Sequence, residues 1–220
     1  MSTIPNSLKR WLGLAPPEAP PAAPPSTGEL RHSNGLREFF LHLKGQAALS
    51  ILDLGPASQA NINFITGLGH KIYHEDIYPE LFSGAYRTRG DDGARSWDAA
   101  AFLQANLNYP QAHFDGVLGW DVLDLLPDPS ALHSVVARLH FITKLRAALL
   151  IFFHTADPGS LVSVSRCQVR SHDALQMFVR GQNYLKRPLN NRNIERLFQD
   201  FHSLKFFLAR DNLREVLVVR

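Results

Sequence analysis

Hydrophobic and polar positions follow two different periods along the first part of this chain. Residues 35–44 place apolar side chains at helical spacing, which predicts a covering helix. Residues 48–54 form a short apolar run ended by Gly55-Pro56, a pattern typical of a strand buried on both faces of a parallel sheet. A helix over 61–68 and a strand over 70–76 follow. One βαβ unit is therefore predicted before residue 77.

Further strands are predicted in the middle of the chain. The segments 101–107, 114–120 and 147–153 are apolar enough for buried strands, although the alanine-rich start of the first also permits a helix. Apolar positions over 130–144 recur at helical spacing and predict a helix between the last two strands. Residues 79–98 are polar and rich in glycine and arginine, so we interpret them as a loop that also permits some helix.

The end of the chain limits the architecture most strongly. Residues 191–201 predict a final helix, and two apolar runs at 205–210 and 213–219 flank the turn-forming pair Asp211-Asn212. Strand-then-helix units closed by an antiparallel pair predict an α/β fold with three layers. We expect a Rossmann-like, mostly parallel seven-stranded sheet with helices on both faces and a C-terminal antiparallel β-hairpin.

The first residues differ from the rest in composition. Seven of the 14 prolines lie in the first 25 residues, a pattern of extended chain rather than of a packed core. We therefore expect residues 1–28 to be a disordered Pro/Ala-rich leader and residues 29–220 to be one domain. Within the leader, residues 7–14 have the spacing of a short amphipathic helix around Trp11, which suggests a hook for a partner. An unstructured tail is the alternative.

Composition excludes several classes of protein. The chain has 220 residues, of which 45% are hydrophobic, but no apolar run approaches the length that crosses a bilayer and no signal peptide opens it. A cytoplasmic location is therefore predicted. The single cysteine, Cys167, excludes an internal disulfide, and one thiol does not hold a structural zinc or an iron-sulfur cluster. We expect no metal site.

Charge is unevenly distributed. Residues 1–137 carry nine Lys/Arg and 14 Asp/Glu, whereas residues 138–220 carry 14 and six, so the net +3 combines an acidic part and a basic part. Basic residues of the long segment 155–193 are interleaved with Phe178 and Tyr184. This pattern fits an anionic ligand or a nucleic acid, although solvated surface arginines are the simpler interpretation.

Three short motifs, taken in order, carry a family resemblance. Residues Ile51 to Pro56, Glu75-Asp76-Ile77 and Phe114-Asp115-Gly116-Val117 resemble class I S-adenosylmethionine-dependent methyltransferases, and the resemblance covers about residues 36–220. It implies that S-adenosyl-L-methionine is the cofactor and that a methyl group passes to an unidentified acceptor, which we expect to be a small molecule. Nucleic acid is a less favoured partner.

The resemblance also implies a set of cofactor-binding positions at the carboxyl ends of the strands. Gly55 lets the backbone approach the ligand, the carboxylate of Asp76 accepts the ribose hydroxyls, and the amide of Asn106 meets the adenine edge. The full set is Asp53, Gly55, Pro56, Ala57, Asp76, Asn106, Leu107 and Trp120.

Two further residues are candidates for catalysis. His154 directly follows a predicted strand and has the chemistry of a general base. Asp121 lies at the mouth of the predicted site, where acceptors enter in this family. Few catalytic groups are obligatory, because methyl transfer is a direct displacement that depends mainly on positioning.

One departure from the family pattern supports an alternative function. The family has Gly-x-Gly-x-Gly after its first strand, whereas residues 55–59 here keep only the first glycine and end in Gln59. A long side chain at that position crowds the cofactor unless it turns outward. The alternative is a non-catalytic binding or regulatory protein with a methyltransferase fold and an impaired cofactor loop.

Overall fold

The computed structural model describes residues 28–89, 95–207 and 211–220. The leader and its Trp11 hook lie outside these residues. The main sheet has six strands in the order β10-β11-β7-β6-β2-β3. Their bounds are β2 (Ser50–Asp53), β3 (Lys71–His74), β6 (Phe114–Trp120), β7 (Thr143–His154), β10 (Ser203–Phe207) and β11 (Leu213–Val219).

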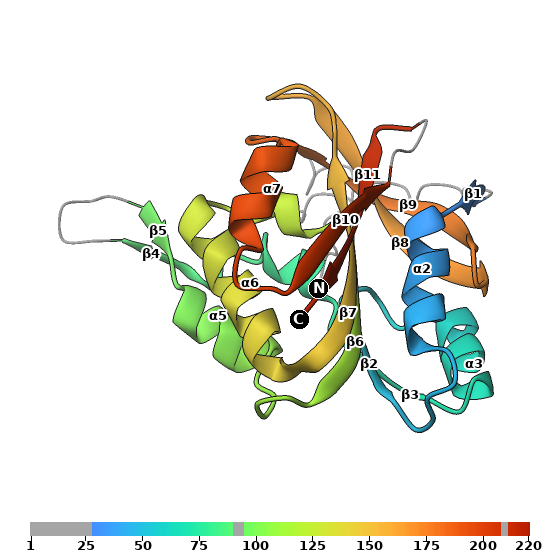
Figure 1. Cartoon of the computed structure of the whole chain (residues 1–220). Helices are drawn as coiled ribbons and strands as arrows, with labels where there is room; N and C mark the ends of the chain where they lie inside the picture. Colours follow the sequence, from blue (N-terminus) through green and yellow to red (C-terminus); the bar gives the residue numbers. More distant parts are fainter. Residues whose placement is uncertain (1–27, 90–94, 208–210) are drawn as a thin grey trace, which may run out of the picture.

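Helices cover both faces of this sheet (Figure 1). One side carries α2 (Asn34–Leu43) and α3 (Gln59–Gly67), and the other carries α5 (Ala99–Asn106), α6 (Pro129–Ile142) and α7 (Asn191–Leu197). Strand β7 is continuously apolar because both of its faces are buried. Leu150 and Phe152 join the core beneath α2, whereas Leu149, Ile151 and Phe153 join the core beneath α6 and α7.

Strand directions agree with the expected α/β architecture. Strands β3, β2, β6 and β7 run parallel, β11 is antiparallel to β7, and β10 is antiparallel to β11. The last two strands therefore close the chain as an antiparallel pair with one reversed strand inside the sheet. Residues 208–210, at the end of the first predicted run, lie outside the described residues.

The predicted strand over 101–107 is wrong. These residues lie in α5, which begins after Asp98, whose side chain accepts a hydrogen bond from the backbone N–H of Ala101 at 2.9 Å. The N-cap and the alanine-rich start favour a helix. Phe102 and Leu103 then bury against the core of the sheet. The main sheet consequently has six strands instead of the expected seven.

The segment expected to be a loop contains short elements. A single helical turn, α4 (Ile77–Glu80), follows β3, and two short antiparallel strands, β4 (Arg87–Arg89) and β5 (Arg95–Trp97), come after it. Residues 90–94 between those strands lie outside the described residues. A 3₁₀ turn, η1 (Leu123–Leu125), connects β6 to α6.

A second sheet is built from a segment for which the sequence predicted no elements. Strands β8 (Leu161–Ser171) and β9 (Ala174–Tyr184) form a long hairpin, and β1 (Glu29–His32) pairs with β9 to make a three-stranded sheet. Strand β8 packs against α3, on the side of the main sheet that carries α2 (Figure 1).

Buried charges fix the second sheet to the main one. The guanidinium of Arg31 on β1 contacts Glu215 of β11, which is 2% exposed, and also Asp211. The other carboxylate oxygen of Glu215 accepts the backbone N–H of Gly35 at 2.6 Å. Because each buried charge has partners of opposite sign or good hydrogen-bond geometry, β1 and α2 are held at defined positions on β11.

Candidate functional site

Asp53 ends β2, and its carboxylate is fully buried among donors from its own chain. One oxygen accepts the indole N–H of Trp120 at 2.5 Å and the backbone N–H of Gly55 at 2.9 Å. The other accepts the amide of Asn61 at 2.9 Å. Burial raises the pKa of Asp53, and these hydrogen bonds oppose that rise.

The space over Gly55 is filled by Trp120. A Cβ on Gly55 would lie 3.1 Å from the indole Cδ1 of Trp120 and 3.1 Å from a carboxylate oxygen of Asp53. Trp120 adopts a left-handed backbone conformation (φ 46°) at the end of β6, and its ring is 3% exposed. The glycine therefore makes room for this indole.

The loop after Gly55 does not crowd the space over the strand ends, although Gln59 in its sequence suggested that it would. Pro56 is partly buried and Ala57 is exposed. Gln59 begins α3 and its side-chain amide bonds the exposed Asn63 at 2.8 Å, so it lies on the helix surface rather than over the strands. What covers the strand ends is a different part of the chain.

That covering element is the hairpin β8–β9. The side chain of Asn61 donates to the carbonyl of Cys167 at 3.0 Å and accepts the N–H of Val169 at 2.8 Å. Asp121, just beyond β6, accepts the N–H of Ser165 at 3.0 Å. Burial raises the pKa of Asp121 to about 6, although the nearby charge of His154 opposes the rise.

Asp76, the expected ribose ligand, is also bound by the hairpin. One guanidinium nitrogen of Arg180 lies 2.7 Å from both of its carboxylate oxygens. The same guanidinium stacks 4.7 Å over the ring of Tyr78. Strand β9 comes this close because residue 181 is glycine: a Cβ there would lie 2.5 Å from the hydroxyl of Tyr78.

His154 at the end of β7 has partners on both ring nitrogens. Its Nδ1 lies 3.1 Å from the carboxylate of Asp124, and its Nε2 contacts the carbonyl of Ser163 at 3.2 Å. Burial lowers the pKa of His154, but the hydrogen bond and charge of Asp124 outweigh it and raise the value to about 9. The imidazole is then protonated near neutral pH, a state without the lone pair that a general base needs.

Asn106 and Leu107 lie away from this cluster. Because residues 99–106 form a helix, Asn106 is not at a strand end, and its amide donates to the carbonyl of Phe102 at 2.9 Å and to the hydroxyl of Tyr86 at 3.2 Å. Leu107 is fully buried in the core. The structure thus brings together Asp53, Gly55 and Trp120 and places neither Asn106 nor Leu107 with them.

Asn61 and Arg180 are the two residues of this cluster that sequence reasoning missed as site residues. Both connect the main sheet to the hairpin. The available signal was the length of the segment 155–193 and the run of alternating valines at 162 and 164, which is typical of a half-buried strand. Nothing in the local sequence around Asn61 indicated a partner more than 100 residues away.

Several basic residues of the segment 155–193 are engaged within the chain. Arg166 stacks 4.8 Å over the ring of Phe178, Arg170 contacts the side chain of Gln176, and Arg187 donates to the carbonyl of Pro127 at 2.5 Å. These arginines therefore do not support nucleic-acid binding, and a nucleic-acid partner stays a prediction.

A cavity of about 450 Å³ lies beside the covered strand ends. Its lining includes the cationic residues Arg87, Lys186 and Arg187 and the aromatic residues Phe82, Trp97 and Tyr184. None of the four cavities identified in the described ranges is lined by Asp53, Gly55 or Asp76. Nor do those ranges contain a helix long and apolar enough to cross a membrane.

Comparison with known proteins yields likeness of fold only. No family model matches the sequence, and no curated protein matches it. Several solved structures that resemble it are S-adenosylmethionine-dependent methyltransferases at low identity. The Burkholderia thailandensis 1,6-didemethyltoxoflavin-N1-methyltransferase, solved with that substrate and S-adenosylhomocysteine, has a TM-score of 0.46 and 13% identity over 86% of this chain and 79% of its own.

Two archaeal structures give similar values. A methyltransferase from Archaeoglobus fulgidus has a TM-score of 0.46 and 14% identity, covering 84% of this chain and 91% of its own. One from Methanosarcina mazei has a TM-score of 0.45 and 14% identity, covering 82% and 95%. At this level the likeness concerns the path of the chain and says nothing of the activity of this protein.

Proposed function

We propose that this chain is a non-catalytic binding or regulatory protein with a methyltransferase fold, in which the hairpin β8–β9 takes the place of the cofactor. The observation that carries the proposal is the occupation of both candidate cofactor carboxylates by the chain itself. Arg180 binds Asp76, and Asn61 connects Asp53 to the hairpin backbone.

The residues at the strand ends do not fit S-adenosyl-L-methionine in this arrangement. A ribose on Asp76 would have to displace a charge-assisted contact at 2.7 Å. A ligand over Gly55 would have to displace Trp120, whose N–H is the closest donor to the buried Asp53. Moving the hairpin would also break the hydrogen bonds of Asn61 to the N–H of Val169 and the carbonyl of Cys167.

Calorimetric titration with S-adenosylhomocysteine tests this proposal. We expect no binding at millimolar ligand to the full chain, and no change when Asp76→Ala is compared with the unmodified protein. Circular dichroism of both proteins controls for folding. Micromolar binding that Asp76→Ala abolishes would overturn the proposal.

A second candidate function is supported by the positions that the fold retains. Asp53 is the last residue of β2, Gly55 comes two residues later, and Asp76 follows the adjacent parallel strand β3. The methyltransferase resemblance implies cofactor-binding residues at these strand ends. The 450 Å³ cavity has the size of a small-molecule site, and aromatic, cationic and acidic side chains line it, Asp124 and Asp128 among the acidic ones. On this alternative, the protein is a S-adenosylmethionine-dependent methyltransferase for a small acceptor, and the hairpin must move before the cofactor binds.

Loosening the hairpin separates the two candidates. The double variant Arg180→Gln with Asn61→Ala removes the side chains that bind it to Asp76 and Asp53. If this variant stays folded and gains micromolar affinity for S-adenosylhomocysteine, the second candidate is favoured. A folded variant that still fails to bind favours the first.

A further inference from the structure

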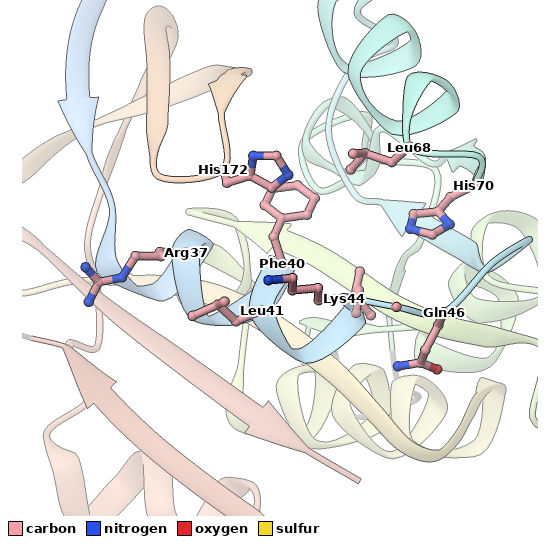
Figure 2. A pocket seen from close by; sticks show the side chains of 10 residues that line it. Arg37, Phe40, Leu41, Lys44, Gln46, Leu68, His70 and His172 are labelled. Atoms are coloured by element: carbon pink, nitrogen blue, oxygen red, sulfur yellow. The ribbon is translucent and has the colours of Figure 1, made fainter.

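A separate groove lies near the amino ends of β2 and β3, whereas the candidate site lies at the carboxyl ends of these strands. Figure 2 shows the side chains that line the groove. Its volume is about 380 Å³, and it is lined by the last turns of α2, the end of α3, the start of β3 and the turn of the hairpin β8–β9. Gln46 precedes β2 and His70 precedes β3, so the groove is at the amino ends of these parallel strands. A ligand in this groove is independent of the function proposed above.

The groove has an apolar floor and rim. Phe40 is buried there; its ring is tilted against that of Phe64 at a centroid distance of 5.2 Å and meets that of His172 edge-on at 5.4 Å. Leu41 is 53% exposed and Leu68 is 36% exposed, an unusual degree of exposure for two large apolar side chains that line one cavity. A ligand with an apolar body would cover both.

Polar groups in the groove carry positive charge or proton donors. His70 is 7% exposed, and its Nδ1 is buried without a hydrogen-bond partner among the described residues. Lys44 is exposed and forms no ion pair within the described chain. Figure 2 shows the rings of His70 and His172 on either side of Leu68, whereas Arg37 turns away from the others.

Among the described residues, no acidic side chain lines this groove, although Asp115 is close enough to His70 to act on it by its charge. A buried imidazole nitrogen without a partner is costly, because its lost hydration is not replaced. A carboxylate oxygen would supply the missing acceptor for an imidazole N–H and would also attract the ammonium of Lys44. With Arg37 and Lys44 in its lining, the groove therefore favours an anion with an apolar body over a cation.

We propose that this groove binds a small carboxylic acid with an apolar body. The carboxylate contacts Lys44 and the ring of His70, and the apolar body lies on Phe40, Leu41 and Leu68. The imidazole of His172 closes the side formed by the hairpin.

Hexanoate is a suitable probe, with hexan-1-ol as the uncharged control of the same chain length. Titration is followed by calorimetry and by the ring C–H resonances of His70 and His172 in the full chain. We expect millimolar or tighter binding of hexanoate with shifts at both rings, and binding of hexan-1-ol about tenfold weaker, since one charge-assisted hydrogen bond contributes about that factor.

Matched variants test the role of the ammonium. Lys44→Gln should weaken hexanoate binding about tenfold. The control Lys186→Gln removes the same charge from the 450 Å³ cavity and should leave hexanoate binding unchanged. Equal binding of hexanoate and hexan-1-ol, equal effects of the two lysine variants, or no shift at His70 would overturn the proposal. His70→Phe fills the site with an apolar ring, and retained affinity in that variant would overturn the contact to His70.

Discussion

Arg180 and Asp76 are 104 residues apart in the sequence, yet one guanidinium nitrogen of Arg180 lies 2.7 Å from both carboxylate oxygens of Asp76. The contact joins the hairpin β8–β9 to the end of β3, where the family resemblance places the ribose of a cofactor. A carboxylate that is already neutralised by its own chain is a poor acceptor for a second ligand. This pair explains why the retained acidic position does not by itself indicate cofactor binding.

Removing this ion pair should loosen the hairpin without unfolding the main sheet. We expect Arg180→Gln to lower the free energy of unfolding by about 1–2 kcal/mol, because both side chains are only partly buried and the pair is a charge-assisted contact. Urea denaturation measures the change. Arg170→Gln, an exposed arginine of the same hairpin, is the control and should change it by less than about 0.5 kcal/mol. Equal losses in the two variants would contradict the importance of the pair.

Asn61 should contribute more than Arg180. Asn61→Ala leaves the carboxylate of Asp53, the carbonyl of Cys167 and the N–H of Val169 without their buried partner, so we expect a loss of about 2–4 kcal/mol. Thermal and urea unfolding both report it. Asn63→Ala, two residues further along α3 on its exposed face, should be nearly neutral. A neutral Asn61→Ala would mean that the hairpin is held mainly by its apolar contacts.

Gly55 tests whether the space above it is filled. Its missing Cβ would lie 3.1 Å from both Trp120 and Asp53, so Gly55→Ala should cost about 1–2 kcal/mol through crowding. Gly67→Ala places a Cβ where nothing lies within 4 Å and should leave stability unchanged or raise it by up to about 1 kcal/mol. If Gly55→Ala were as harmless as Gly67→Ala, an open space over Gly55 would be indicated.

The ion pair of His154 and Asp124 predicts a dependence of stability on pH. The pKa of His154 rises from 6.5 to about 9 on folding, so the folded state holds the proton more tightly. Its contribution is complete below pH 6.5 and is lost as the pH rises through about 9, a loss on the order of 3 kcal/mol. Urea denaturation across this range measures it. His154→Gln should be less stable at neutral pH and should lack this part of the slope; an unchanged slope would refute the assignment.

Cys167 offers a direct probe of hairpin opening. Its thiol is buried on β8, and burial raises its pKa well above the ordinary value, so a maleimide should not label it in the folded protein. Arg180→Gln should raise the labelling rate about tenfold, because local opening becomes easier by roughly 1.4 kcal/mol. Labelling of the unmodified protein at the rate of its urea-unfolded form would show that the hairpin does not cover the thiol.

The local pattern of apolar residues predicted the strands that are buried on both faces. The apolar runs that became β2, β6, β7 and β11 are recognisable because both faces of these strands are covered. The strand prediction for 101–107 was wrong because its apolar residues fit a helical period as well as a buried strand. The N-cap Asp98 favours the helix. The hairpin of 161–184 was missed because many of its outward side chains are polar or only half buried, so its apolar signal is weak.

The sequence by itself determined a three-layer α/β chain with acidic residues after two adjacent parallel strands, because strand burial and strand ends are local properties of a segment. Only the tertiary structure decided whether those residues are free. Arg180 and Asn61 meet their partners across more than 100 residues, and such contacts depend on the path of the whole chain rather than on neighbouring residues. The same path assembles the groove around His70 and Lys44 from three separate stretches of the chain, 37–46, 68–70 and residue 172.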